Sequence, residues 1–251
     1  MPARILSPLF LTASALIFIG LERLIPYDRG QRIFRAGFWT DLVWYTIIQS
    51  YVLALAIGLI IRSLDRTTGL SRLHLISGWP LGGQLAFFLV THDLYIYLFH
   101  RWQHRSPRLW RIHQAHHSVT DVDWLAGARS HALEILINQT IEFLPITLLG
   151  AAPALPLLKG MVDAIWGMFI HANLDVRLGP VGLIINGPEL HRWHHAREIR
   201  KGGINFGTKL AIWDHLFGTV VRPRRRPSGY GLRGYFPSGY LDQTLFAFRR
   251  R

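Results

Sequence analysis

Hydrophobic residues form two long stretches of the chain that contain no charged side chain. Residues 5–21 provide 17 such positions and residues 42–61 provide 20. Because about 20 predominantly apolar residues in a helix cross the hydrocarbon core of a bilayer, both stretches predict membrane-spanning helices. The first stretch begins close to Met1 but lacks a basic leader and a small-residue cleavage site, so we expect it to be retained.

Three further apolar stretches, interrupted by polar residues or prolines, lie at residues 81–98, 135–158 and 161–174. Polar groups within a span are costly unless they are paired, so His92 and Asp93 suggest a site that faces the interior of a bundle. Residues 151–156 contain two prolines and predict a tight hairpin between helices. The pattern predicts an all-α integral membrane protein with four to five transmembrane helices, forming a single domain over residues 1–251.

Arginine supplies most of the positive charge. The chain has 28 Lys and Arg against 15 Asp and Glu, a formal net charge of +13. Such an excess can bind nucleic acid or lipid headgroups. A nucleic-acid module has no use for long uncharged stretches, so we expect membrane association and no nucleic-acid partner. Arginines flanking spans set orientation, and those in residues 23–37, 101–131 and the tail after residue 192 predict a cytoplasmic C-terminus, although the loop at residues 62–79 breaks the pattern.

The chain contains no cysteine and 13 histidines. Disulfides, cysteine-bound zinc, iron–sulfur clusters and thiol nucleophiles are therefore excluded. The sequence also lacks the His-Glu-x-x-His, Gly-x-Ser-x-Gly and phosphate-binding glycine motifs. Their absence disfavours a hydrolase, an ATPase and a self-contained flavin or nicotinamide enzyme. We expect no bound flavin or haem.

Histidines gather in three short boxes with helical spacing. The boxes are His100-Arg-Trp-Gln-His104, His113-Gln-Ala-His116-His117 and His191-Arg-Trp-His194-His195. At 13 histidines in 251 residues, a single His-x-x-His-His match is expected by chance only about 0.03 times per chain. Neighbouring residues on a helix diverge by about 100°, so each doublet can reach toward two metal ions. Eight imidazoles without cysteine favour two borderline metals, held in a cytoplasmic helical cap beyond the spans.

The order and context of these boxes resemble the fatty acid hydroxylase and sterol desaturase superfamily of membrane di-iron oxygenases. The resemblance covers about residues 85–220 and rests on the boxes together with residues 93–104, 129–134, 171–173, 205–207 and 213–219. The chain has Phe206 where the family often has tyrosine, and Ala132 where it often has proline. Neither difference touches an expected ligand.

The resemblance implies a set of metal ligands. The expected ligands are His100, His104, His113, His116, His117, His171, His191, His194 and His195. Further candidates, as ligands or as partners of a ligand's second ring nitrogen, are His131, Asp93, Glu134, Asn173 and Asp214. No catalytic residue beyond the metal ligands is expected.

The resemblance also implies chemistry. Two iron ions, for which zinc could substitute, would use O₂ to hydroxylate or desaturate an unactivated C–H bond of a lipid such as a sterol, a fatty acyl chain or a carotenoid. Because the chain carries no electron-transfer motif, a separate ferredoxin or cytochrome would supply electrons. A zinc-dependent membrane lipid hydrolase and a non-catalytic metal-binding membrane protein remain as alternatives, which analysis of the bound metal separates.

Overall fold

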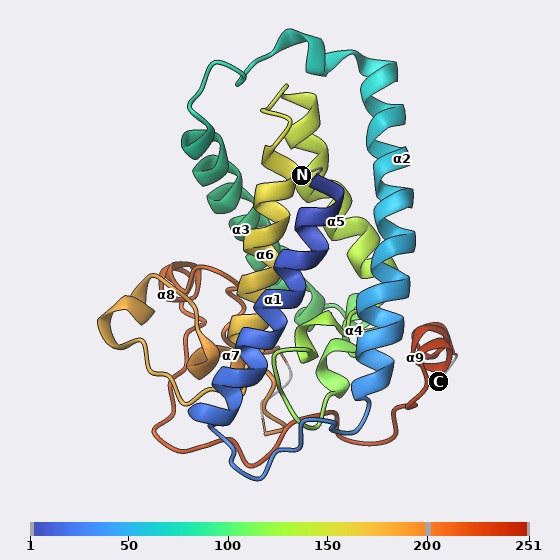
Figure 1. The fold of residues 1–251 in the computed structure, drawn as a ribbon. Helices are drawn as coiled ribbons and strands as arrows, with labels where there is room; N and C mark the ends of the chain where they lie inside the picture. Colours follow the sequence, from blue (N-terminus) through green and yellow to red (C-terminus); the bar gives the residue numbers. More distant parts are fainter. Residues whose placement is uncertain (1–2, 199–201, 250–251) are drawn as a thin grey trace.

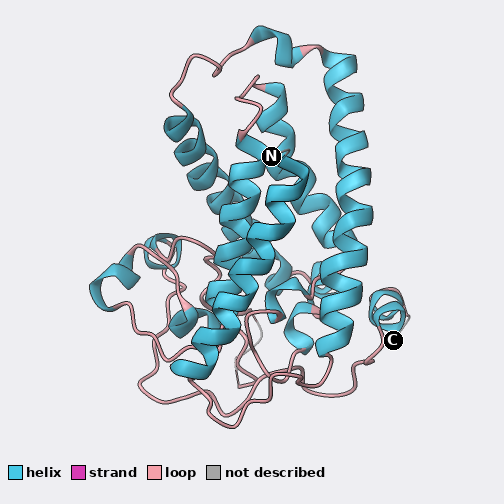
Figure 2. Ribbon diagram, viewed as in Figure 1, coloured by secondary structure: helices cyan, strands magenta, loops and turns pink. Residues whose placement is uncertain are grey.

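The computed structural model describes residues 3–198 and 202–249, and over these ranges the chain folds into helices joined by loops, with three isolated β-bridges. The all-α class expected from the hydrophobic pattern is confirmed (Figure 2). The long helices are α1 (Ala3–Leu24), α2 (Ser50–Thr68), α3 (Leu81–Arg105), α5 (Ala132–Leu148) and α6 (Leu155–His171). The short α-helices are α4 (Pro107–His113), α7 (Pro188–His194), α8 (Ile212–Leu216) and α9 (Tyr240–Phe246).

The segment before α2 is a π-helix, η1 (Thr40–Gln49), which runs directly into α2. In this segment two side-chain hydroxyl groups donate to the backbone carbonyl five residues earlier, which reflects its wide turns. The Thr46 hydroxyl donates to the Asp41 carbonyl, and the Ser50 hydroxyl donates to the Tyr45 carbonyl. Such turns are rare and frequently occur at functional sites. Short 3₁₀ turns are η2 (Leu70–Leu73), η3 (His116–Ser118), η4 (Ala126–Ala128) and η5 (Gly179–Leu183).

The long helices pack in pairs around the bundle axis. Helix α1 packs on α6 and α2 packs on α5, while α3 contacts both α4 and α6. Helix α2 buries Leu53, Ile57 and Ile61 against α5, and its opposite face exposes Tyr51, Leu55 and Leu59. Such apolar side chains on the outside of a helix are what a lipid environment favours, because lipid tails are as apolar as the side chains themselves.

One helix among the described residues, the continuous segment Thr40–Thr68, is both long and apolar enough to span a membrane, judged by length and composition alone. Helices α5 and α6 have 17 residues each, fewer than the roughly 20 that span a bilayer without local thinning. The number of transmembrane helices therefore stays a prediction. The hairpin expected at residues 151–156 is present, but its loop lies at 149–154, so residues 155–158 begin α6 instead of ending α5.

The three histidine boxes lie at one end of the bundle. The last turns of α3 and α6 meet α4 and α7 there, and the loop between α2 and α3 lies at the other end together with the α5–α6 hairpin (Figure 1). The turn from α3 to α4 is sharp because Ser106 caps α4, its hydroxyl accepting a bond from the Leu109 amide, and Pro107 follows in the first turn. This turn brings the first two boxes together.

Candidate metal centre

Two helices and a turn bring the first two histidine boxes against each other. His100 and His104 lie one turn apart on α3, while His113 ends α4 and His117 follows in η3. The Nε2 atoms of His100 and His113 are 3.1 Å apart, as are those of His117 and His104. Rings that are separated in sequence by the α3–α4 turn therefore point their outer nitrogens at one common space.

The third box meets the end of α6. The Nε2 atom of His171 lies 2.9 Å from that of His191 and 3.2 Å from that of His195. It also lies 3.4 Å from Nε2 of His116. His171, expected only from the family resemblance, is therefore at the centre of this group.

Ring nitrogens of the boxes form two separate clusters, and within each cluster the nearest nitrogens all lie within 4.8 Å of one another. The five-histidine cluster contains His100, His104, His113, His117 and His194; the four-histidine cluster contains His116, His171, His191 and His195. The two members of each doublet therefore face different clusters. Each cluster has a number and type of nitrogen donors that could hold one borderline metal ion such as iron or zinc.

Hydrogen bonds on the far side of the rings fix how several imidazoles carry their protons. The Nδ1 atoms of His100, His116, His171 and His194 lie 2.8–3.1 Å from the backbone carbonyls of Phe206, Arg129, Gly167 and Ile204 respectively. A carbonyl only accepts, so each of these Nδ1 atoms carries the proton and donates it. Each Nε2 atom then presents a bare lone pair to its cluster.

These lone pairs show that the site fits a cation. Nε2 of His116 and of His171 are 3.4 Å apart with no proton between them, and Nε2 of His194 is buried with no partner among the described residues. Protonation would not satisfy these lone pairs, because burial holds the pKa of His116 and of His194 well below the usual range. A metal ion coordinated by these nitrogens would satisfy the lone pairs.

Loops at the end of the bundle supply three of the four carbonyls that orient the rings, and the fourth, of Gly167, belongs to α6. The Asp214 carboxylate accepts bonds from the amides of Phe206 and Gly207 at 2.8 and 2.7 Å, which sets the turn whose carbonyl faces His100. Glycine is required where the backbone passes close to a ring. A Cβ at Gly127 would lie 2.7 Å from Nδ1 of His171, and one at Gly203, where φ is +66°, would lie 2.8 Å from Nδ1 of His104.

The additional candidate residues differ in their placement. Glu134 lies 2.9 Å from Nδ1 of His113 and, of the five, is the one that forms a hydrogen bond with a box histidine. The Asp93 carboxylate instead accepts bonds from the amides of residues 209 and 210 and from the side chains of Thr208 and of Trp213 in α8. Asn173 bonds the backbone of Asp28.

His131, a candidate ligand or partner of a ligand, lies outside both clusters. Its Nδ1 atom accepts a bond from the Leu133 amide and caps α5, and its Nε2 atom donates to the Thr244 carbonyl. Both nitrogens are therefore engaged in holding the start of α5 and the C-terminal helix.

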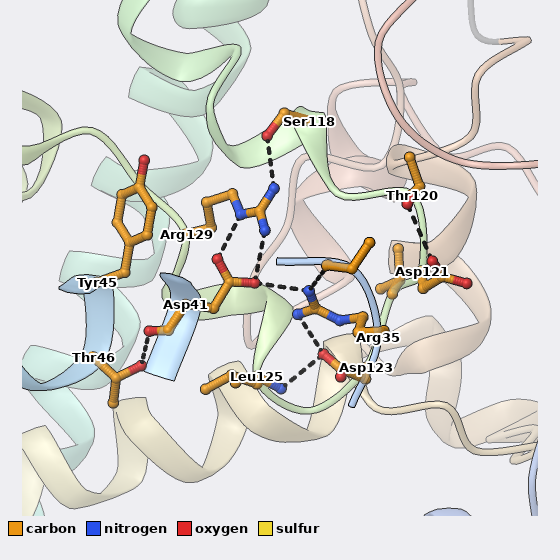
Figure 3. A network of polar contacts seen from close by, with 12 residues as sticks. Arg35, Asp41, Tyr45, Thr46, Ser118, Thr120, Asp121, Asp123, Leu125 and Arg129 are labelled. Atoms are coloured by element: carbon orange, nitrogen blue, oxygen red, sulfur yellow. Dashed lines mark hydrogen bonds and ion pairs between the residues drawn. The ribbon is translucent and has the colours of Figure 1, made fainter. Parts of the chain in front are cut away.

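A buried ion network, not anticipated from the sequence, supports the loop between the second box and α5. Arg129, whose carbonyl faces His116, donates to both carboxylate oxygens of Asp41 at 2.6 and 3.0 Å. Arg35 joins Asp41 to Asp123 through contacts of 2.8 Å on each side (Figure 3). In the sequence, Asp41 stands directly before the uncharged stretch at residues 42–61. No motif or spacing links it to Arg129, which lies 88 residues later.

Two cavities reach the histidines. The inner cavity, of about 670 Å³, lies within the bundle, and His100, His113, His116, His171 and His191 line it. The outer cavity, of about 750 Å³, lies at the box end of the bundle, where His104, His117, His194 and His195 line it. Each cluster is therefore bordered by both cavities.

The fold and the site define a helical protein with two histidine clusters that could each hold a metal ion. The family model for fatty acid hydroxylases matches residues 85–219. The chain belongs to this family, and the resemblance seen in the histidine boxes is confirmed.

The relatives are lipid-modifying enzymes. An ornithine lipid hydroxylase of Rhizobium tropici is 33% identical over 249 residues, which cover 96% of this chain and 75% of the relative. Human alkylglycerol monooxygenase is 33% identical over 127 residues, which cover 51% of this chain and 28% of the relative. The zebrafish (Danio rerio) alkylglycerol monooxygenase is 34% identical over 148 residues, which cover 59% of this chain and 32% of the relative. The chain thus spans about a third of the length of these monooxygenases. No solved structure matches the chain.

We expect Asp41→Ala to destabilise the protein strongly, because it leaves Arg35 and Arg129 buried without one of their partners. Removing one partner of a buried ion pair typically costs about 3–5 kcal/mol. The matched control is Asp242→Ala, since Asp242 pairs with Arg249 at 3.6 Å on the surface and such pairs contribute about 1 kcal/mol or less. Thermal unfolding in detergent measures both. Equal unfolding midpoints for the two variants would show that the network does not support the fold.

Proposed function

We propose that the protein is an iron- and O₂-dependent hydroxylase of a membrane lipid. The observation that supports this most is the pair of buried imidazole clusters, with lone pairs directed inward, in a chain of the fatty acid hydroxylase family. The relatives are named as hydroxylases and monooxygenases, which favours hydroxylation over desaturation. Ornithine lipids and alkylglycerols, the substrates in their names, are the first lipids to test.

The histidines would hold two metal ions, one in each cluster. When bound, two iron ions supply activation of O₂ and oxidation of a C–H bond. The chain's own contribution is to orient the donors: carbonyls of residues 129, 167, 204 and 206 hold the ring protons away from the clusters. Most of the cluster histidines are buried, which limits their contact with bulk water and protects a reactive site from side reactions.

The balance of the reaction requires an external reductant. One oxygen atom enters the C–H bond and the other leaves as water, consuming two electrons and two protons. We expect an acidic ferredoxin or cytochrome to deliver the electrons at the outer cavity, because the lining of this cavity is basic. Its rim carries Arg105, Arg111, Arg197 and Arg233 against a single acidic residue, Glu198.

The experiment that tests the function is hydroxylation by the purified, iron-loaded protein in lipid vesicles under ¹⁸O₂, with an external reductant. One ¹⁸O atom should appear in ornithine lipid or in hexadecylglycerol, and the bound iron should approach two ions per chain. The proposal would be contradicted if the protein bound zinc, hydrolysed one of these lipids, and oxidised neither of them when loaded with iron.

Substitution of one histidine in each cluster tests the assignment of ligands. We expect His194→Ala and His116→Ala to lose bound iron and to lower activity by more than the 10- to 100-fold typical of changes around a ligand. His74→Asn is the matched control, because His74 is exposed at the opposite end of the bundle and asparagine tolerates its positive φ of 49°. Iron content and product formation are measured per folded protein. Wild-type values in both alanine variants would remove these residues from the site.

The orientation in the membrane, with the histidine boxes and C-terminus cytoplasmic, can be tested on a cysteine-free background. Gly78→Cys lies in the α2–α3 loop, and Arg224→Cys lies at the box end; both positions are exposed. In intact cells or right-side-out vesicles, an impermeant maleimide should label position 78 directly and position 224 only after permeabilisation. The reverse pattern would invert the orientation, and equal access to both would argue against alternating spans.

A further inference from the structure

We propose that the lipid substrate enters the inner cavity sideways from the bilayer, through an opening between α1 and the π-helix η1. This inference rests on the proposed lipid hydroxylation and adds the route and the residues that form it. The inner cavity is lined on one side by Leu11, Thr12 and Ala15 of α1 and on the other by η1 and the first residue of α2.

The cavity reaches the surface at this place. Thr12, Ile47 and Ser50 line the cavity and are also exposed. Helix α1 packs mainly on α6, and α2 packs mainly on α5. The π-helix η1 itself contacts η4 and α9, so the two elements that border the opening are held by different partners.

Toward the box end, the opening is closed by packed side chains. Phe18 of α1 lies in one apolar cluster with Phe38, Trp124 and Leu125, and Ala15 and Leu42 pack against it. The route from the opening therefore turns inward between α5 and α6. There the cavity is lined by Ile135, Met168 and Ile170 as well as the histidines, so it is continuous with the candidate metal centre.

The surface around the opening is the part of the molecule that hydrocarbon would contact. Leu16 and Ile17 on α1 expose 64% and 61% of their surface, and Tyr51 and Val52 on α2 expose 68% and 55%. An opening flanked by such side chains faces lipid tails if these helices span the bilayer. A volume of about 670 Å³ lies in the range of pockets that bind small ligands, which suits one chain of a lipid.

The inner wall also carries polar groups. Glu134, Asn138 and Glu142 are spaced four residues apart on α5, so they share one helical face, and all three line the cavity. Asp163 and Lys209 extend the polar wall, with Lys209 Nζ 3.0 Å from Asp163 Oδ1. A lipid that carries hydroxyl groups near its chain is therefore a better probe of this cavity than a plain hydrocarbon.

Photolabelling tests the route without requiring activity. The probe is a hexadecylglycerol with a diazirine in its chain, mixed into phosphatidylcholine vesicles that contain the 251-residue protein. Labels should appear on the cavity side chains Trp124, Ile135 and Met168. The pair Thr12→Trp with Ile47→Trp narrows the opening and should reduce these labels about tenfold. Labels on the outer helix faces should not change.

The matched control is the pair Ala13→Trp with Ile48→Trp, on the same two elements at exposed positions that do not line the cavity. It should label like wild type. Thr12→Cys, blocked by a bulky thiosulfonate and released by a reductant, gives a reversible closure in a chain that has no native cysteine. Its cavity labels should fall on blocking and return on release.

The proposed route would be overturned if cavity labels persisted both in the double tryptophan variant and in the blocked Thr12→Cys variant. It would also be overturned if the wild-type protein were labelled only on its outer helix faces. Labelling that follows the opening in a protein that hydroxylates no lipid would leave the route standing while the proposed function fails. The two conclusions are therefore separable.

Discussion

Mutual repulsion of imidazole lone pairs is the constraint on which the rest of this structure depends. His100, His116, His171 and His194 turn their protonated nitrogens outward to carbonyls, so bare lone pairs meet inside the two clusters. Burial opposes protonation, and an unsatisfied buried acceptor costs about 1–3 kcal/mol. A cation coordinated by these nitrogens would satisfy the lone pairs, so we expect metal binding to stabilise the fold.

Irregular loops hold most of the imidazole rings in place, and buried polar side chains in turn fix the conformation of these loops. Asp41 fixes Arg129, whose carbonyl faces His116, and Asp214 fixes the turn whose carbonyl faces His100. Both carboxylates are almost completely buried and accept several bonds, as a charge away from water requires. Neither carboxylate bonds a histidine of the clusters; each acts through the backbone whose carbonyl faces a ring.

The two cavities give the candidate centre different surroundings on its two sides. The inner cavity runs among apolar helix faces and suits a lipid chain, while the outer cavity is bordered by arginines at the end of the bundle. A reaction that joins a lipid, O₂ and electrons benefits from such separation, because the substrate and the reductant then reach the clusters by different routes. The polar stripe of α5 suggests that the part of the lipid admitted to the bundle is not purely hydrocarbon.

Periodicity and spacing in the sequence determined the helical class, the family and the grouping of the histidine boxes, since helical geometry places residues three and four apart on one face. They did not determine which cluster each ring joins, nor the roles of Asp41, Arg35 and Asp214, because these depend on contacts between residues far apart in the chain. His131 and Asn173 were candidates from the sequence, yet His131 bonds the Thr244 carbonyl in α9 and Asn173 bonds the Asp28 carbonyl after α1. Only the packing of α3, α6 and α7 decided that His171 meets the third box, since a lone histidine carries no spacing signal and tertiary proximity alone gives it partners.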